Sequence, residues 1–370
     1  MTQGQYSRKT KEISAQDVYQ LTEETLQGHW HLDMESSRYE AEDIWDVLIA
    51  ASVERISIEM ACELLEEAPS PNTVRSAIHT LLSDEATMAE IQSMINAMLA
   101  DRLPRKLLQS RLPAAIDLTE IPYHGEHDED DEWVRRSKPK HGTSHFHMYA
   151  TLYVVKQNKR YTLALMLVRR TDKMVDVLKH LLARGQALGL RLKRLYLDRG
   201  FDNNGVVSYL QQQPFPTILP LVHRGRSGGS RRLLTGRKSH HTTYTRSSRV
   251  YGEQTFPVFV VCKYSKGRYR RQGLVRFAYV VIGKLNLSPQ QVFQEYRRRF
   301  AIESSYRLMN TMRARTTSTS VALRLFLVAL AFLLLNLWSY VKWTHLFIPK
   351  SGPRRIFHHL LPLARWRLWL

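Results

Sequence analysis

The sequence predicts a mixed α/β protein with additional helical regions at both ends. Apolar residues recur at helical spacing up to about residue 108, form strand-length runs between 109 and 222, and return to helical spacing after 288. The chain has 370 residues, of which 44% are hydrophobic, enough for two or three domains with a substantial core. We therefore expect a helical domain over 1–108, the first part of an α/β core over 109–222, a β-rich basic insertion over 223–287 and helices over 288–370.

The N-terminal region is expected to hold three short helices. Segments 39–55, 57–68 and 72–85 carry apolar residues at helical spacing, and Ser57 and Asn72 stand where helix caps are expected. The tight break before the third helix is compatible with a helix-turn-helix DNA-binding domain, whose recognition helix would offer Arg75 and His79 to DNA. A small helical bundle without DNA contacts explains the pattern equally well. The basic helix after residue 97 reads as a linker.

From residue 109 onwards the pattern alternates between strands and helices. Short apolar runs bounded by turn residues predict strands, and longer amphipathic runs predict helices. The resulting order, β-β-β-α-β-α-β, is typical of a mixed sheet with helices on its faces. The expected strands cover 112–125, 146–155, 159–170, 190–198 and 216–222, and the expected helices cover 174–189 and 204–213.

The segment 223–287 departs from this order. It opens on a basic, Gly- and Ser-rich loop and continues with two expected strands, 255–264 and 273–283, joined by a basic turn. A helix follows, with Ser288 as its cap and Pro289 at its first position. The apolar run 321–343 is long enough to cross a membrane, but Arg324, Asn336 and Lys342 interrupt or flank it, which favours a buried core helix over a membrane span.

The charge of the chain favours a polyanionic partner. Lys and Arg number 54 against 34 Asp and Glu, which gives a net charge of +20. A protein this basic most often binds nucleic acid, although a merely basic enzyme is the alternative. Cys62 and Cys262 lie too far apart for a zinc motif and are expected to be reduced thiols of a cytoplasmic protein.

Two aspartates are placed to form a metal site. Asp117 lies in the first expected strand, and Asp198 ends the fourth, in the stretch "LYLDRGFDN". The two strands can be neighbours in a mixed sheet, and two adjacent carboxylates repel each other unless a cation or proton joins them. Such hard oxygen ligands suit Mg²⁺ or Mn²⁺, and two ions can activate a water or a 3′-hydroxyl and stabilise a leaving oxygen. A turn-starting aspartate is the alternative for Asp198.

The helix after the insertion offers a third carboxylate. Tyr296, Arg299, Glu303 and Arg307 are spaced three, four and four residues apart, so they share one helix face. Arginine grips phosphate through paired hydrogen bonds, so this face can bring Glu303 to a metal and Arg299 to a DNA phosphate. An ordinary solvated Arg–Glu pair is the alternative for an isolated helix of this kind.

Other basic and titratable clusters are weaker candidates. The acidic run 128–132 is expected to be a solvated loop, and His141, His145 and His147 are expected to face DNA rather than bind zinc. The basic segment 223–249 is expected to contact phosphates, with a plain loop as the alternative. Its candidate DNA-binding residues are Arg224, Arg226, Arg231, Arg232, Arg237 and Lys238.

Taken as an ordered set, these motifs resemble the DDE transposases of bacterial and archaeal insertion sequences, in the cut-and-paste branch with a Tyr-Arg-Glu-Lys signature. "DLT" around Asp117 and "DRGF" around Asp198 match the first two acidic motifs. Tyr296, Arg299 and Glu303 match the signature spacing, whereas Asn310 occupies the lysine position. Nearby Arg307 or Arg313 could replace that lysine. The likeness covers about 108–315 and includes the β-rich insertion.

The resemblance implies an RNase H-like catalytic core with Asp117, Asp198 and Glu303 as catalytic metal ligands, and Tyr296 and Arg299 beside the phosphate flanking the cut. It implies dependence on Mg²⁺, binding to terminal repeats and target DNA, and a homodimeric synaptic complex. The expected function is cleavage of transposon ends followed by joining to target DNA, in the prokaryotic cytoplasm at the nucleoid. The alternatives are a nuclease that cuts without joining, a non-catalytic DNA-binding derivative, and a membrane-anchored protein.

Overall fold

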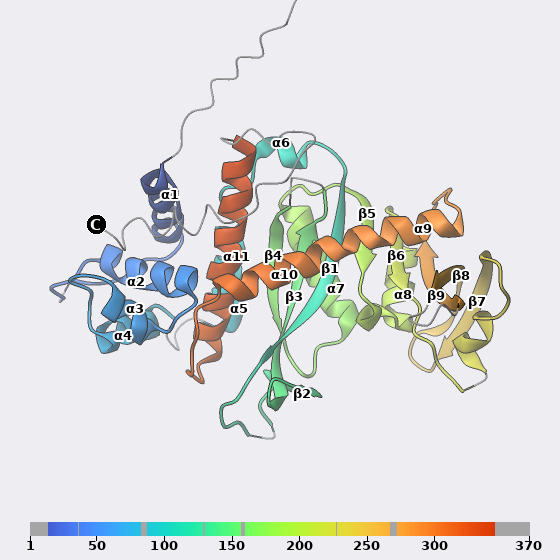
Figure 1. Ribbon diagram of the computed structural model, residues 1–370, viewed down its shortest axis with the longest axis horizontal. Helices are drawn as coiled ribbons and strands as arrows, with labels where there is room; N and C mark the ends of the chain where they lie inside the picture. The colour runs from blue at the N-terminus through green and yellow to red at the C-terminus, as the bar shows by residue number, and fades with distance from the viewer. Residues whose placement is uncertain are drawn as a thin grey trace, which may run out of the picture.

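The protein is built around one twisted mixed sheet with helices on both faces, as the computed structural model in Figure 1 shows. Helices α1–α4 lie at one end of the molecule and strands β7–β9 at the other, so the sheet runs from the middle of the molecule to the end opposite these helices (Figure 1). The residues described are 14–35, 37–82, 87–128, 130–156, 160–226, 228–266 and 272–344.

The sheet has a parallel centre and antiparallel flanks. Its order is β2-β3-β1-β5-β6-β9-β8-β7, with β4 also paired to β3. The pairs β1–β5 and β5–β6 are parallel, and the others are antiparallel. The strands are β1 (Leu112–Pro122), β2 (Val134–Lys140), β3 (Thr143–Val154), β4 (Thr162–Val168), β5 (Leu192–Leu197), β6 (Thr217–Pro220), β7 (His240–Ser248), β8 (Gly252–Lys266) and β9 (Gln272–Ile282).

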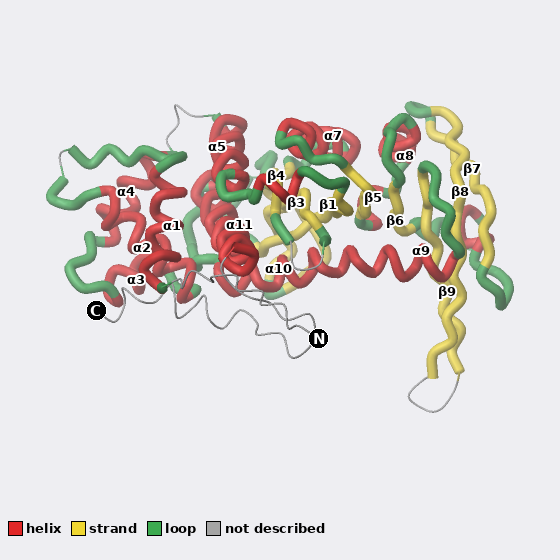
Figure 2. The backbone as a smooth tube through the Cα atoms, turned by 90° about the horizontal axis from the view of Figure 1, so that it is seen from above, coloured by secondary structure: helices red, strands yellow, loops and turns green. Residues whose placement is uncertain are grey.

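The helices fall into three groups. Helices α7 and α8 pack on one face of the sheet, and α9 and α10 run along the other face. Helices α1, α2 and α5 pack against α11, and α3 and α4 pack against α2 (Figures 1 and 2). The helices are α1 (Ala15–Gln27), α2 (Ala41–Glu54), α3 (Ile58–Leu64), α4 (Pro71–Leu81), α5 (Met88–Ala100), α6 (Arg105–Leu108), α7 (Met174–Ala187), α8 (Asn204–Gln211), α9 (Pro289–Tyr296), α10 (Phe300–Met312) and α11 (Val321–Thr344).

Strand alternation divides the core into two layers. Successive side chains of a strand point to opposite faces, so odd and even positions separate. Ala115 of β1 and Tyr196 of β5 belong to the core shared with α9–α11, whereas Ile116 and Leu197 belong to the core shared with α7 and α8. The residues that follow at the same parity, Asp117 and Asp198, therefore face α10.

Amide side chains cover the free edge of β4. The Asn96 carboxamide of α5 accepts from the Leu165 N–H at 2.7 Å and donates to the Leu165 carbonyl at 3.0 Å. Asn336 of α11 does the same for Thr162, at 2.9 and 2.8 Å. An exposed strand edge can pair with another chain. These amides satisfy the outward backbone groups of β4, so helices α5 and α11 close this edge of the sheet.

Helix α11 is a core helix. Its length and mean hydropathy of 2.3 would suffice to cross a membrane, but 83% of its most apolar window is buried inside the protein. Trp30, which follows α1, and Trp45 of α2 both lie against its Phe326, at ring-centroid distances of 5.3 and 6.2 Å. The expectation of a buried helix over 321–343 is thus confirmed.

All five strands expected between 112 and 222 are present, as are the cap Ser288 and the proline at the first position of α9. Strands β2 and β7 were missed, because their sequences are polar and they lie largely exposed, held in the sheet by pairing with one neighbouring strand each. The expected insertion extends the sheet directly, since β9 pairs with β6. Asn72 was wrong as a cap, because Ser70 accepts from the Thr73 N–H.

The candidate helix-turn-helix is three helices, α2–α4. Residues 65–70 connect α3 to α4, a longer connection than the tight turn expected from the break at the prolines. Arg75 of α4 is paired with Glu59 of α3 and hydrogen-bonded to Asn72, while His79 is exposed. Arg75 therefore serves the contact between the two helices in this structure.

Candidate active site

Asp117 and Asp198 lie side by side on the face of the sheet that α10 covers. Strands β1 and β5 run parallel, and the pair Ile116–Leu197 sets their register. Asp117 and Asp198 follow one residue later on each strand, at the same level. The expected adjacency of the first and fourth strands is therefore confirmed, and the parallel register accounts for two carboxylates at one position.

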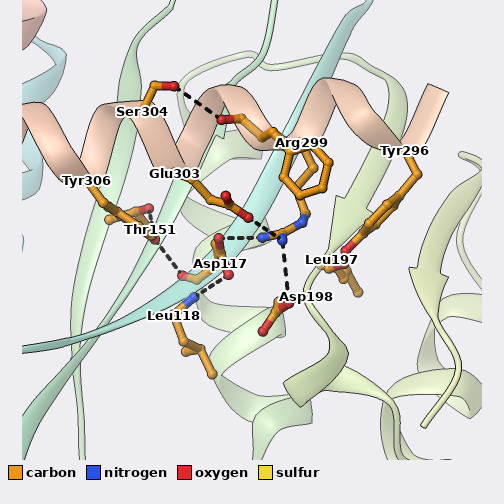
Figure 3. A network of polar contacts seen from close by, with 11 residues as sticks. Asp117, Leu118, Thr151, Leu197, Asp198, Tyr296, Arg299, Glu303, Ser304 and Tyr306 are labelled. Atoms are coloured by element: carbon orange, nitrogen blue, oxygen red, sulfur yellow. Dashed lines mark hydrogen bonds and ion pairs between the residues drawn. The ribbon is translucent and has the colours of Figure 1, made fainter. Parts of the chain in front are cut away.

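Glu303 reaches these aspartates from α10. The helix expected from Ser288 onwards is interrupted by a 3-10 turn, Arg297–Arg299, between α9 and α10. Ile302, Tyr306 and Met309 of α10 bury against the sheet and the neighbouring helices. Their burial turns the adjoining face, with Arg299 and Glu303, towards the middle of β1 and the end of β5 (Figure 3).

The guanidinium of Arg299 lies between the three carboxylates. Its Nη1 is 2.5 Å from Asp117 Oδ2, and its Nη2 is 2.9 Å from Glu303 Oε1 and 3.7 Å from Asp198 Oδ1 (Figure 3). The Arg299 side chain is only 8% exposed, so this is not the solvated helix pair considered from sequence. The two aspartates and the Arg–Glu helix face predicted from the sequence thus lie together in one site.

The site is closed around Asp117 and open around the other two acids. The Asp117 side chain is 6% exposed, against 36% for Asp198 and 40% for Glu303. Burial raises the pKa of Asp117 to about 7, even though the Arg299 guanidinium opposes this rise. A phosphate can therefore approach on the side of Asp198 and Glu303.

Two buried tyrosines fasten the helix to the strands that carry the aspartates. The Tyr296 hydroxyl donates to the Leu197 carbonyl, next to Asp198, at 3.1 Å. The Tyr306 hydroxyl donates to the Asp117 carbonyl at 2.9 Å and lies 2.7 Å from the Thr151 hydroxyl (Figure 3). In this structure Tyr296 thus binds backbone rather than solvent. No role in the site was assigned to Tyr306 from the sequence, although its position three residues after Glu303 indicates that it approaches the same strand.

The three carboxylates around Arg299 are oxygen ligands of the type that hard divalent cations prefer. Among the residues described, no three acidic, histidine or cysteine side chains are disposed to hold an ion directly. The guanidinium of Arg299 lies where a shared cation would lie. Asp117, Asp198 and Glu303 could therefore hold a divalent ion once Arg299 moves aside.

The other predicted DNA-binding residues lie outside this cluster. Arg307 is exposed on α10 and Arg226 is exposed after β6. Arg231 and Arg232 are exposed in a 3-10 turn, Gly229–Leu233. Arg237 and Lys238 are exposed before β7, and the Arg224 guanidinium donates to the Asp202 carbonyl. The basic turn at 268–271 falls outside the residues described.

The histidines behave differently from one another. His147 is 1% exposed, and its Nδ1 lies 3.2 Å from the Trp133 carbonyl, so the expectation that it faces DNA was wrong. Packing of β3 under the Trp133 segment buries it. His145 stacks near His127 at a ring distance of 4.1 Å, and His141 is exposed.

Comparison with known proteins gives two matches and one negative result. Residues 109–337 match the family described as "Transposase DDE domain". No curated protein sequence matches significantly. The fold is similar to a piggyBac transposase solved by cryo-electron microscopy as a synaptic complex with hairpin DNA, with a TM-score of 0.55 and 12% identity. That match covers 97% of this chain and 77% of the other, and it supports an RNase H-like transposase fold.

The family match covers more than half of the chain and spans β1, β5 and α10, the three elements that bring Asp117, Asp198 and Glu303 together. The acidic motifs in the sequence and the geometry of the site therefore identify the same three residues. The chain belongs to the transposases with a DDE domain.

Proposed function

We propose that this protein is a DNA transposase that cuts the ends of its own element by metal-dependent phosphodiester hydrolysis and joins the freed 3′-hydroxyl to target DNA. The observation that supports the proposal is that Asp117, Asp198 and Glu303 all contact the buried Arg299 guanidinium, in a member of the DDE family. The proposal includes membership of the bacterial and archaeal branch with the Tyr-Arg-Glu-Lys signature, and action at the nucleoid in the cytoplasm.

The three carboxylates have one role in this proposal. Asp117, Asp198 and Glu303 would hold two divalent ions, Mg²⁺ or Mn²⁺, through their charged carboxylates. When bound, such ions activate the attacking oxygen and stabilise the leaving one. The rigid strands β1 and β5 hold the aspartates in place, and the half-exposed sides of Asp198 and Glu303 admit the DNA.

Arg299 has a second role. In the structure its Nη1 and Nη2 groups contact carboxylates, and the same fork matches the oxygens of a phosphate. On this proposal Arg299 exchanges its carboxylate partners for the phosphate flanking the cut. Tyr296 keeps its bond to the Leu197 carbonyl and thereby holds Arg299, three residues later, over the site.

The partner in the piggyBac complex is hairpin DNA in a synaptic assembly. We extend this to the chain as double-stranded DNA bound by a homodimer, with the terminal repeats of the element and the target as its two substrates. The net charge of +20 supports a partner rich in phosphate.

The test begins by selecting bound DNA from random and genomic fragments, which should recover one inverted-repeat end. Duplexes carrying that end are then incubated with Mg²⁺ and with a target plasmid. Asp117→Ala, Asp198→Ala and Glu303→Ala should each abolish cleavage and keep DNA binding, whereas Asp176→Ala, an exposed acid on the opposite face, should cleave normally.

Three results would overturn parts of the proposal. Cleavage without any joined product would make the protein a nuclease. Full cleavage by one of the carboxylate variants would remove that residue from the site. Binding without cleavage by the unaltered protein, in Mg²⁺ or Mn²⁺, would make it a non-catalytic DNA-binding protein.

A further inference from the structure

The turn that follows Asp198 is fastened to the basic segment after β6 by one buried aspartate. Asp202 is 3% exposed, and its carboxylate accepts from the Arg246 guanidinium at 2.8 Å and from the Val222 N–H at 2.6 Å. Its own carbonyl accepts from the Arg224 guanidinium at 3.3 Å. Asp202 therefore joins three segments, the turn 198–203, the segment 222–224 and the edge strand β7.

A hydroxyl extends this junction towards the next 3-10 turn. Ser230 is buried, donates to the Val222 carbonyl at 2.6 Å and accepts from the Arg224 N–H at 2.8 Å. The neighbour of Ser230 in the chain is Arg231, which is exposed. The position of Arg231 is thus fixed, through Ser230 and Val222, by Asp202.

Arg199, His223 and Arg231 form what we call the basic rim. Arg199 is exposed and directly follows Asp198. Burial and the nearby charges of Arg199 and Arg231 together lower the pKa of His223, so these three groups are neighbours. Arg199 lies in the turn that begins at Asp198, and its carbonyl accepts from the Asp202 N–H at 3.0 Å, so it stands at the edge of the active site.

The charges of the rim are uncompensated. Within the described ranges, neither Arg199 nor Arg231 forms an ion pair with a carboxylate, whereas Arg299 contacts three. An ordinary surface arginine needs no fixed support, yet here a buried ion pair and two buried hydrogen-bonding groups hold the rim in place. Two exposed guanidiniums held beside an open carboxylate site are suited to the phosphates of a nucleic-acid strand.

We propose that Arg199 and Arg231 bind phosphates of the DNA strand that enters the active site, and that Asp202 is the positioning residue that fixes both arginines. The proposal rests on the proposed function in taking DNA as the ligand. It adds Arg199 to the candidate DNA contacts and gives a role to Asp202 and Arg246, which lie outside the catalytic carboxylates.

The test uses non-specific binding, so it depends neither on the terminal repeat nor on cleavage. A fluorescent random-sequence duplex is titrated with the full chain over a series of salt concentrations, and log affinity is plotted against log salt. Each lost phosphate contact flattens the slope by about 0.9. Arg199→Gln and Arg231→Gln should each show this loss, while Arg105→Gln, an exposed arginine of α6 far from the rim, should show none.

Asp202 is tested by paired variants, because removing it alone would leave Arg246 as a buried, uncompensated cation. Asp202→Ala with Arg246→Met removes both charges and the link to Val222, and should flatten the slope by as much as the two arginine substitutions together. Asp202→Asn with Arg246→Met keeps an acceptor for the Val222 N–H and should restore part of the slope. Adding Arg199→Gln to the first pair should then cost little more.

An unchanged slope for both Arg199→Gln and Arg231→Gln, with unchanged melting temperatures, would overturn the phosphate contacts. Fully additive losses, or equal slopes for the Ala and Asn pairs, would overturn the positioning role of Asp202. If the unaltered protein cuts its own ends, either of these results leaves the proposed function standing. If it does not cut them, a flattened slope for Arg199→Gln or Arg231→Gln still shows that these arginines contact phosphate.

Discussion

The Arg299 guanidinium replaces, in this structure, the positive charge that three carboxylates need. Arg299→Ala should lower the free energy of unfolding in chelator by about 3–5 kcal/mol, because it leaves Asp117 beside two other acids without a cation. Mg²⁺ should then stabilise the variant more than the unaltered protein, since the ion no longer competes with the guanidinium. The measurement is thermal melting with and without Mg²⁺.

The control for this substitution is its neighbour. Arg298→Ala removes an exposed residue whose pair with Glu295 lies at the surface, and should change stability by less than about 1 kcal/mol. Equal stabilisation of Arg299→Ala and the unaltered protein by Mg²⁺ would show that Arg299 and the ion do not share the site.

The Tyr306 hydroxyl links α10 to the backbone of Asp117 and so sets the distance between Glu303 and Asp117. Tyr306→Phe should cost about 1–3 kcal/mol of stability for its two hydrogen bonds. It should also raise the Mg²⁺ concentration needed for half-maximal cleavage. Tyr161→Phe is the matched control, because that buried hydroxyl has no partner among the residues described. An unchanged Mg²⁺ requirement would limit Tyr306 to packing.

At the scale of elements, His147 makes the junction of β2 and β3 sensitive to pH. Its Nδ1–H donates to the Trp133 carbonyl, and its buried Nε2 has no partner in the described part of the chain. Burial, more than the nearby Arg324 charge, lowers the pKa of His147 to about 4. The unfolded chain binds this proton below about pH 6.5, so folding stability is complete above that pH and is lost as the pH falls towards 4.

The loss from His147 should reach about 3 kcal/mol at the acid end of this window. His147→Gln keeps a donor for Trp133 but cannot take up a proton, so its free energy of unfolding should fall less steeply between pH 6.5 and 4. The exposed His31→Gln serves as the control. Denaturant titrations at several pH values supply the slopes, and parallel slopes for His147→Gln and the unaltered protein would contradict the assignment.

At the scale of the whole molecule, α11 holds the N-terminal helices and the sheet together. Leu330 is fully buried near its centre. Leu330→Ala should therefore reduce the free energy of unfolding by about 2–5 kcal/mol, whereas Leu323→Ala, at a partly exposed position, should cost less. The protein should also purify without detergent. A requirement for detergent, together with no effect of Leu330→Ala, would favour a membrane anchor.

The sequence by itself determined the features that depend on short-range pattern. Periodicity of two or 3.6 residues located the strands between 112 and 222 and the helices around them, because burial of one side repeats with the local geometry of the backbone. The motifs around Asp117, Asp198 and Glu303 named three acids of one set. Strands β2 and β7 were not predicted, because polar edge strands show little alternation of apolar and polar residues.

Only the tertiary structure decided how distant segments meet. Asp117 and Asp198 share a level because β1 and β5 pair in parallel at one register, a contact between residues about 80 positions apart. The burial of Arg299 among three carboxylates, the bond from Tyr306 to Asp117, and the junction at Asp202 likewise join residues that no local pattern relates. The identity of a side chain limits which partners it can bind, and long-range packing decides which of those partners it contacts.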